Sequence, residues 1–389
     1  MQELKRRGHQ VKAFFPDSGF PGADYHKYYG DKDTYHIVKF PVTYEGVDLY
    51  TFPLIIRDPN PRNYEQAWTF KDLTERELEA YFKYIRQELE QVIAEFAPDV
   101  IECQHVWAID HLLKDMGYHY ICVAHHSDQL GFLFDERMSR RALQSAESAS
   151  YIFAVSDFVK DEVLELYQVP PEKVIVTGNG YNQSIFELMS GLDRERVLAD
   201  LGCGKLEEHP LITFCGKISA TKGIDILLEA NKIIQEKKKA YILLMGSGNL
   251  DALQKKSGGR FHMENVIYLG QRSQMDLAKL HNIAALSVLP SRTEGFGIAA
   301  LEAMGCGKPV VYTNAGGLAS FAVGRMVEKE NPHELAQSIL QILSLEEIDY
   351  RELCRHAYSA AQKHSWESIV DIRMKYYSEI YFLNRGKRI

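Results

Sequence analysis

The sequence predicts an α/β protein built from two doubly wound domains, and three observations lead to that prediction. Short apolar, β-branched runs alternate with amphipathic helical stretches along the chain, which is the pattern of parallel strands covered by helices on both faces. The 389 residues suffice for about two or three domains of ordinary size. The alternation also falls into two series, separated by a charged, glycine-containing stretch from about Leu188 to Pro210 that we interpret as a linker.

The strands of the first series are short and rich in β-branched and aromatic residues. We expect them at Val11–Phe15, Tyr35–Phe40, Val47–Phe52, Val100–Cys103, Tyr120–Ala124, Tyr151–Val155 and Val174–Val176. Apolar residues between Leu73 and Phe96 recur at spacings of mostly three and four, which predicts one long amphipathic helix.

The second series begins after Leu201. We expect its strands at Leu211–Cys215, Tyr241–Met245, Val266–Leu269, Ala285–Leu289 and Pro309–Tyr312. The stretch from Ser365 to Ile389 predicts a single amphipathic helix that crosses back to the first domain. The predicted domains are therefore residues 1–195 and 196–364, followed by a crossover helix at residues 365–389.

Composition and charge exclude several classes of protein. A hydrophobic content of 46% and a charged content of 25% are typical of a folded globular protein. The net charge of -8 argues against a broad basic face for nucleic acid or anionic lipid. The six cysteines contain no C-x-x-C pair, so neither a zinc knuckle nor a disulfide framework is expected. No apolar run approaches the roughly 20 residues of a membrane span, and the start lacks the apolar core of a signal peptide, so we expect a cytoplasmic protein.

The most informative motif follows the strand Ala285–Leu289. Two doubly wound domains bind ligands at the carboxyl ends of their strands, so we expect a cleft bounded by the strand ends of both domains. The stretch Pro290–Gly297 offers backbone that a ligand can approach closely and precedes a helix start suited to phosphate or sugar oxygens. Glu294 and Glu302 add two carboxylates that can accept hydrogen bonds from sugar hydroxyls. The alternative is an ordinary strand-to-helix loop with one capping and one solvated glutamate.

A second loop carries two lysines. The strand Leu211–Cys215 ends in Gly216, and Lys217 and Lys222 follow it before Gly223. Two ammonium groups on one loop suit a diphosphate, because each charge-assisted hydrogen bond contributes roughly 1.5–3 kcal/mol. The alternative is a pair of solvated surface lysines.

Other strand ends carry weaker signals. Gly246 lies in a Gly-Ser-Gly turn after Tyr241–Met245, and such a turn alone is more often structural than ligand-binding. In the first domain, His125 and His126 follow one strand and His105 follows another. Adjacent histidines on an extended strand point to opposite sides, so at most one of them faces the cleft. We expect a structural role for His126 and leave both roles open for His105. No metal site is expected, because only Asp128 lies at a ligand spacing from His125.

Taken together, these motifs resemble glycosyltransferase family 4, whose members are retaining enzymes of the GT-B architecture with two Rossmann-like domains. The resemblance covers nearly the whole chain and rests on motifs that stand in the family's order. These are the Glu-x7-Glu string from Glu294 to Glu302, the Gly-Lys…Lys-Gly loop with Lys217 and Lys222, and Asn179-Gly180.

The resemblance implies a donor site in the second domain and a catalytic histidine in the first. The implied donor-binding residues are Gly216, Lys217, Lys222, Gly246, Gly295, Phe296, Gly297 and Glu302, and the implied catalytic residues are His125, Lys222 and Glu294. The lysines would hold the donor diphosphate and Glu302 the ribose. Glu294, the backbone after it and His125 would contact the transferred sugar. His105 and Asp128 are the candidates for the acceptor side.

Two departures from the family pattern stand out. The family usually has arginine where Lys217 stands, so planar bidentate phosphate binding gives way to a point charge. Members also open with a strand and a glycine-rich loop, whereas this chain begins inside the helix that follows them, at Leu4-Lys-Arg-Arg-Gly-His. Either the true start lies upstream or the first sheet lacks a strand.

The reaction that the resemblance implies retains the anomeric configuration, with the departing diphosphate as base and without a metal or a bound cofactor. A UDP-sugar would be the co-substrate, and UDP-linked N-acetylglucosamine is our first hypothesis. The acceptor would be small, and a looser resemblance to enzymes of aminoglycoside antibiotic pathways suggests an aminocyclitol such as 2-deoxystreptamine. For an amine, the candidate carboxylates are Glu102, Asp128, Asp135 and Glu136. Other hypotheses are a cell-surface glycan or lipid acceptor, a nucleotide-sugar epimerase or hydrolase, and a non-catalytic binding protein.

Overall fold

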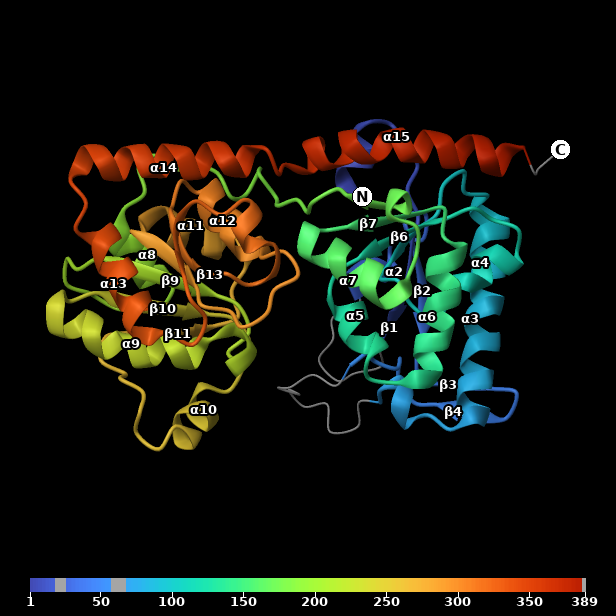
Figure 1. Ribbon diagram of the computed structural model, residues 1–389, viewed down its shortest axis with the longest axis horizontal. Helices are drawn as coiled ribbons and strands as arrows, with labels where there is room; N and C mark the ends of the chain where they lie inside the picture. Colours follow the sequence, from blue (N-terminus) through green and yellow to red (C-terminus); the bar gives the residue numbers. More distant parts are fainter. Residues whose placement is uncertain (18–25, 57–67, 387–389) are drawn as a thin grey trace. The chain divides into compact units, whose positions relative to one another are not determined.

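The structure, a computed structural model, describes residues 1–17, 26–56 and 68–386. It comprises two compact units. Unit 1 consists of Met1–Thr177 together with Val370–Ile389, and unit 2 of Gly178–Ile369. The elements of both can be followed in Figure 1.

The units divide at Thr177 and Ile369 instead of at the expected residues 195 and 364. Two features place the intervening residues in unit 2. The backbone N–H of Met189 donates to Asn282 of that unit at 2.9 Å, and α8 (Arg194–Asp200) forms inside the stretch that we interpreted as a linker. Asp193 caps this helix by accepting a hydrogen bond from the backbone N–H of Arg196. Its Val197 and Leu198 then pack into a hydrophobic core of unit 2, so the stretch belongs to that unit.

Unit 2 contains a six-stranded parallel sheet in the order β11-β10-β9-β12-β13-β14. Its strands are β9 (Leu211–Cys215), β10 (Tyr241–Met245), β11 (Val266–Gly270), β12 (Leu286–Leu289), β13 (Val310–Thr313) and β14 (Gly324–Val327). Its further helices are α9 (Ile224–Lys237), α10 (Leu250–Lys256), α11 (Gln274–Ile283), α12 (Ile298–Gly305), α13 (Pro332–Leu343) and α14 (Glu347–Gln362), with 3-10 turns at Ala220–Lys222 and Gly316–Ser320.

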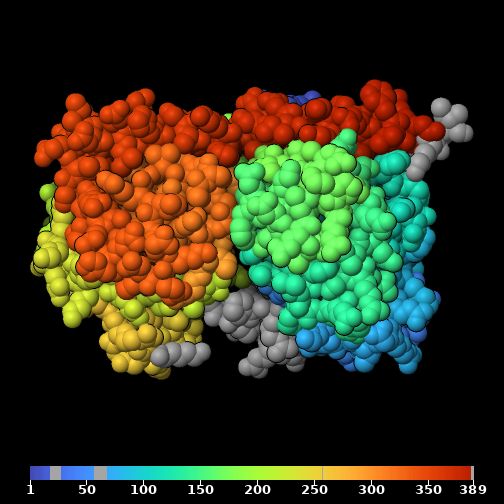
Figure 2. Space-filling view, in the orientation of Figure 1, coloured from blue at the N-terminus to red at the C-terminus, as the bar shows by residue number. Residues whose placement is uncertain are grey.

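Both faces of this sheet are covered, as the sequence predicts. Successive strand residues point to opposite faces, so Ile212 and Phe214 of β9 pack into one hydrophobic cluster and Leu211 into another. The first cluster also contains residues of α9 and α13, and the second contains residues of α8 and α11. Most side chains of α14 are exposed, and Figure 2 shows this helix at the surface.

Unit 1 contains a four-stranded parallel sheet in the order β5-β6-β7-β8, a separate parallel pair β1-β2 and an antiparallel hairpin β3-β4. Its strands are β1 (Ala13–Asp17), β2 (Tyr35–Lys39), β3 (Val42–Tyr44), β4 (Val47–Leu49), β5 (Glu102–Gln104), β6 (Ile121–Ala124), β7 (Tyr151–Ala154) and β8 (Val174–Val176). Its helices are α1 (Gln2–Arg6), α2 (His26–Tyr29), α3 (Glu75–Phe96), α4 (His111–Asp115), α5 (Ser127–Phe132), α6 (Glu136–Ser148) and α7 (Asp157–Tyr167), with 3-10 turns at Phe70–Asp72 and Pro171–Lys173.

Strands β3, β4 and β14 differ from the sequence prediction, and β1 and β5 begin two residues later than expected. The run expected at Val47–Phe52 is shorter and belongs to the hairpin, where Val47 pairs with Tyr44 across the turn residues Glu45 and Gly46. The edge strand β14 was missed, because its sequence Gly-Arg-Met-Val has two exposed central residues and no apolar run.

The predicted C-terminal helix is present as α15 (Trp366–Arg385), and its residues from Val370 onward belong to unit 1. Tyr376 and Tyr377 pack their rings against Phe153 of β7. Arg373 donates hydrogen bonds to Glu102 of β5 and to Thr177. Among the described residues, no helix combines the length and the apolar character that crossing a membrane requires.

Candidate active site

The predicted donor residues lie on loops at the carboxyl ends of neighbouring strands of unit 2. The lysine loop follows β9 and the Glu294 loop follows β12, and these two strands are adjacent in the sheet. Lys222 Nζ lies 2.7 Å from Glu294 Oε1 although 72 residues separate them in sequence. Ser291 Oγ donates a second hydrogen bond to the same oxygen at 2.8 Å. The structure therefore pairs two of the three predicted catalytic side chains.

Glycines allow the backbones of these loops to approach each other. A Cβ on Gly223 would lie 1.7 Å from the carbonyl oxygen of Pro290, and Gly223 has a positive φ of 68°. A Cβ on Gly316 would lie 1.5 Å from the carbonyl oxygen of Glu294. No side chain fits at either position, so the local geometry of the site depends on glycine.

Further predicted donor residues lie on the lysine loop and at the neighbouring end of β10. Gly216 lies at the end of β9, where its N–H donates to the carbonyl of Met245 in β10, and a Cβ on Gly246 would meet the carbonyl oxygen of Gly216 at 1.9 Å. The side chain of Lys217 is exposed. The Gly-Ser-Gly turn after β10 is held by Tyr268, whose single hydroxyl hydrogen is shared between the carbonyl oxygens of Gly246 and Gly248, each 3.1 Å away. Tyr268 belongs to no motif recognised in the sequence.

The Glu294 loop leads into α12 through Gly297, which has a φ of 98° at the N-terminus of the helix. The ring of Phe296 is buried and stacks on Phe321 with centroids 4.6 Å apart. Only the backbone of Phe296 is therefore available to a ligand. The carboxyl group of Glu302, further along α12, receives no hydrogen bond from any described residue, and burial raises its pKa to about 7.

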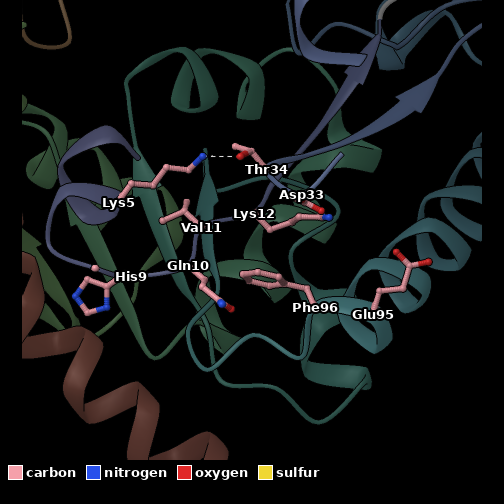
Figure 3. Close-up of a pocket in the computed structure, with 10 residues that line it drawn as sticks. Lys5, His9, Gln10, Val11, Lys12, Asp33, Thr34, Glu95 and Phe96 are labelled. Carbon is pink, nitrogen blue, oxygen red and sulfur yellow. Dashed lines mark hydrogen bonds between the residues drawn. The ribbon is translucent and has the colours of Figure 1, made fainter. Parts of the chain in front are cut away.

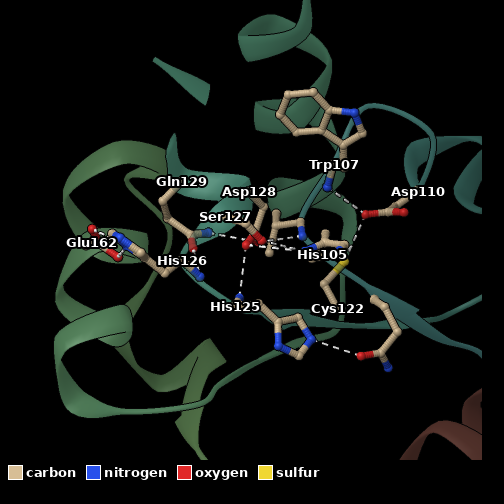
Figure 4. Close-up of polar contacts among 12 residues, drawn as sticks. His105, Trp107, Asp110, Cys122, His125, His126, Ser127, Asp128, Gln129 and Glu162 are labelled. Carbon is tan, nitrogen blue, oxygen red and sulfur yellow. Dashed lines mark hydrogen bonds and ion pairs between the residues drawn. The ribbon is translucent and has the colours of Figure 1, made fainter. Parts of the chain in front are cut away.

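In unit 1, the predicted histidines lie at the carboxyl ends of the adjacent strands β5 and β6 (Figure 4). The rings of His105 and His125 lie 5.0 Å apart, and Gln104 Oε1 lies 2.9 Å from His125 Nε2. Burial and then the neighbouring charge of His105 lower the pKa of His125 to about 4. His125 is therefore neutral at physiological pH, with ring nitrogens that can donate and accept. The sequence analysis did not identify Gln104, although it immediately precedes His105.

Asp128 organises this cluster from a fully buried position. Its carboxylate accepts hydrogen bonds from the backbone N–H of Val106 at 2.8 Å and of His125 at 2.9 Å, and from the side chain of Gln129. His105 Nδ1 lies 3.6 Å from it. Burial opposes ionisation of Asp128, but the hydrogen bond and charge of His105 outweigh that effect and lower its pKa. Burial likewise opposes protonation of His105, but Asp128 raises the pKa of that imidazole overall.

His126 turns away from this cluster toward Glu162, whose carboxylate lies 2.8 Å from His126 Nδ1 (Figure 4). Both His105 and His126 have left-handed backbone conformations, with φ values of 77° and 79°. Such a conformation is uncommon outside glycine, and strained residues of this kind cluster at functional sites.

Most carboxylates that we expected to receive an amine are engaged within the protein. Glu102 is paired with Arg373 and accepts a hydrogen bond from Tyr377. Asp128 is buried, and Asp135 caps α6 and is paired with Arg137. Glu136 is the one exposed carboxylate of these four, and it is paired with Arg140.

A hollow of about 650 Å³ also lies in unit 1 (Figure 3). It is lined by Lys5, residues 8–12, Asp33, Thr34, Glu95 and Phe96. Lys5 Nζ in this hollow already donates a hydrogen bond to Thr34. None of the sequence-predicted site residues lines it.

Comparison with known proteins bears on the identity of the chain. Residues 1–184 match the family described as Glycosyltransferase Family 4, and residues 203–364 match Glycosyl transferases group 1. The glycosyltransferase MJ1607 of Methanocaldococcus jannaschii is 29% identical over 70% of this chain and 73% of its own length. The glycosyltransferase MJ1178 of the same organism is 30% identical over 69% of this chain and 71% of its own length.

A solved structure shares the fold. Anabaena Alr3699/HepE in complex with UDP-glucose superposes with a TM-score of 0.66 over 95% of this chain and 98% of its own, at 20% identity. The two Rossmann-like domains and the parallel sheets are therefore those of the GT-B fold. Since both family matches follow one another along the chain and a relative shares 30% identity over most of its length, the protein belongs to glycosyltransferase family 4 and is a GT-B transferase.

Proposed function

We propose that this protein transfers a sugar from a UDP-sugar to a hydroxyl group of a small acceptor, with retention of the anomeric configuration. The observation that carries the proposal is the pairing of Lys222 with Glu294 where the loops after β9 and β12 meet. A cation beside a carboxylate at a glycine-lined backbone suits a ligand that has a diphosphate at one end and a sugar at the other. The complex of HepE with UDP-glucose supports a uridine nucleotide as the donor carrier.

In this proposal the residues of unit 2 bind the donor. Lys217 and Lys222 neutralise the diphosphate, and their contribution grows as the leaving group gains charge in the transition state. Glu302 accepts hydrogen bonds from the ribose hydroxyls. Glu294, once Lys222 turns to the diphosphate, accepts hydrogen bonds from hydroxyls of the transferred sugar, and the backbone from Gly295 to Gly297 contacts the same sugar.

The reaction breaks the bond between the anomeric carbon and the diphosphate oxygen and forms a bond from that carbon to the acceptor oxygen on the same face. The acceptor's proton passes to the departing diphosphate, which then leaves with the electron pair of the broken bond. The protein contributes position and charge stabilisation and forms no covalent intermediate in this scheme. We further propose that no metal ion takes part.

In unit 1, we assign His125 to the transferred sugar. Nε2 of the neutral imidazole donates to Gln104 Oε1, so Nδ1 accepts a hydrogen bond from a sugar hydroxyl, and the buried Asp128 holds the backbone N–H of His125. Asp128 therefore acts as a positioning residue instead of contacting the acceptor. His105, exposed by about a third of its side chain and paired with Asp128, is the acceptor-side candidate.

N-acetylglucosamine is the first sugar to test, and a panel of UDP-sugars decides between it and glucose or other hexoses. The aminocyclitol hypothesis loses its main physical support, because Glu102, Asp128 and Asp135 already have partners within the protein. Neutral, phosphorylated and amino acceptors therefore belong in the panel on equal terms.

The deciding experiment combines donor and acceptor panels with product analysis by NMR. A glycoside with the donor's anomeric configuration supports the proposal, and an inverted product refutes retention. Release of free sugar or an epimerised nucleotide from donor alone supports the hydrolase or epimerase hypothesis. Binding of donor without turnover of any acceptor supports a binding protein. Activity that disappears with a chelator and returns with a divalent cation refutes metal independence.

A further inference from the structure

The guanidinium of Arg292 has a complete set of partners in unit 2. Arg292 lies on the Glu294 loop, two residues before the glutamate. Its Nη1 and Nη2 donate to the two carboxylate oxygens of Asp225 at 2.7 and 2.8 Å. Nη2 also donates to Glu330 Oε2 at 2.8 Å, Nε donates to the other oxygen of Glu330, and Nη1 donates to the carbonyl of Ala220. All five N–H groups of the side chain are thereby used, so Arg292 has no donor left for a ligand.

These contacts join the two donor loops. Ala220 and Thr221 belong to the lysine loop, and the backbone N–H of Arg292 donates to the carbonyl of Thr221 at 2.9 Å. Lys222 follows directly, and its ammonium group meets Glu294. Arg292 thus contacts the residues immediately before Lys222 with its own side chain and backbone.

The two acidic partners of Arg292 lie on different kinds of element. Asp225 lies in the first turn of α9, whose Ile224 and Leu227 are fully buried. Glu330 lies in the turn between β14 and α13 and has a left-handed φ of 59°. Arg292 is therefore held by one carboxylate from a core helix and one from an exposed turn, and the hydrogen bonds to Asp225, followed by those to Glu330, raise its pKa above the ordinary value.

We propose that Arg292 is a positioning residue of the donor site. It does not touch the donor, but it holds the lysine loop and the Glu294 loop in one register, so that Lys222 meets the diphosphate at the correct place. We call the hydrogen bonds of Arg292 to Asp225, Glu330 and Ala220 the clamp. The effect of the clamp on donor binding rests on the proposed function, whereas the clamp itself is a property of the loops.

Lysine is not equivalent to arginine here. An ammonium group has three donors and no planar fork, so it cannot engage Asp225 and Glu330 through paired hydrogen bonds at the same time. A variant Arg292→Lys keeps the charge and loses the forks. It therefore separates the contribution of geometry from that of charge.

The test measures binding of UDP by titration calorimetry for Arg292→Gln, Arg292→Lys and wild type. We expect affinity to fall about tenfold or more in Arg292→Gln, and by a smaller factor in Arg292→Lys. The matched control is Arg260→Gln, because Arg260 lies in the same unit and its exposed side chain is paired with Glu229 at 3.3 Å. Affinity in this control should equal that of wild type.

A double-mutant cycle distinguishes positioning from a general loss of stability. If Arg292 acts through Lys222, then Arg292→Gln should have little further effect on UDP affinity in a Lys222→Ala background. If Arg292→Gln lowers UDP affinity by the same factor in the wild-type and in the Lys222→Ala protein, the proposal is overturned. Should Arg292→Gln fail to fold, Arg292→Lys and Glu330→Gln, which weaken the clamp without removing its link to Asp225, replace it in the cycle.

Amide hydrogen exchange tests the clamp without requiring that the protein binds UDP, so failure of the inference and failure of the proposed function can be told apart. We expect Arg292→Gln, and not Arg260→Gln, to speed exchange at the amides of residues 216–223 and 291–297. Unchanged exchange overturns the clamp whether or not UDP binds. If Arg292→Gln exchanges faster but the wild-type protein binds no UDP, the clamp stands, and both the donor assignment and the positioning role are refuted. UDP affinity unchanged by Arg292→Gln in a wild type that does bind UDP overturns the positioning role alone.

Discussion

Substitution of Glu302 should change the affinity for the donor and the stability of the protein in opposite directions. Burial raises the pKa of this carboxyl group from 4.5 to about 7, and no described residue hydrogen-bonds it. The ribose hydroxyls of a donor would supply the missing donors and favour the ionised form. We therefore expect the affinity for the donor to rise with pH across neutrality.

The magnitude follows from the ionised fraction of the carboxyl group. With a pKa of about 7, roughly nine tenths of the groups are ionised at pH 8 and roughly one tenth at pH 6. If the ionised form binds, affinity for the donor should fall about tenfold between pH 8 and pH 6. The nearby thiol of Cys215 does not interfere, because burial raises its pKa to about 12.

The same shift has a cost in stability. Since the folded pKa of Glu302 exceeds the unfolded one, the folded protein loses stability as pH rises from about 4.5 to about 7. The difference between 4.5 and about 7 corresponds to at most about 3 kcal/mol at pH 8. Glu302→Gln removes this cost, so it should raise the free energy of unfolding at pH 8 while it weakens donor binding.

The assay is calorimetric titration with UDP-glucose, whose diphosphate stays ionised throughout, at pH 6, 7 and 8, together with urea unfolding at the same values. Glu302→Gln should abolish the pH dependence of binding, and Arg260→Gln should preserve it. A wild type that binds the donor equally well at pH 6 and pH 8 refutes the assignment of Glu302. A Glu302→Gln variant that is less stable at pH 8 refutes the argument from burial.

Three further predictions concern catalysis, backbone geometry and acid stability. Lys222→Ala and Glu294→Gln should each lower transferase turnover by orders of magnitude while circular dichroism stays unchanged, and full activity in either variant contradicts the assignment. Gly316→Ala should lower both thermal stability and donor affinity, because its Cβ would lie 1.5 Å from the carbonyl oxygen of Glu294, and normal melting and binding would show that the loop adapts. Burial lowers the pKa of His281 from 6.5 to about 4. Between these pH values the imidazole is protonated in the unfolded chain but not in the folded one. The free energy of unfolding should therefore fall by at most about 3 kcal/mol as pH drops from about 6.5 to about 4. Urea unfolding of wild type and His281→Gln at pH 7.5 and 5 checks this, and an equal loss in both proteins excludes His281 as the cause.

Local sequence predicted the elements well wherever burial produces a regular pattern. The strands of unit 2 from β9 to β13 appear within one residue of their expected bounds. The central strands β9, β10, β12 and β13 are largely buried and read as continuous apolar runs, and the edge strand β11 shares the apolar run Val-Ile-Tyr-Leu. The edge strand β14 and the hairpin β3-β4 have no such pattern and were missed or misassigned. The helix α8 was taken for a linker, because its apolar residues Val197 and Leu198 stand among charges.

By itself the sequence determined the fold class, the two-series organisation and the candidate residues of the donor site, since these depend on local periodicity and on motifs at strand ends. Only the tertiary structure decided how those residues act on one another. It brings Lys222 to Glu294 across 72 residues, buries Asp128 behind His125, and turns Arg292 into a link between two loops. The physical reason is that strand order in a sheet places distant strand ends side by side, and burial then sets which of their polar groups remain available to a ligand.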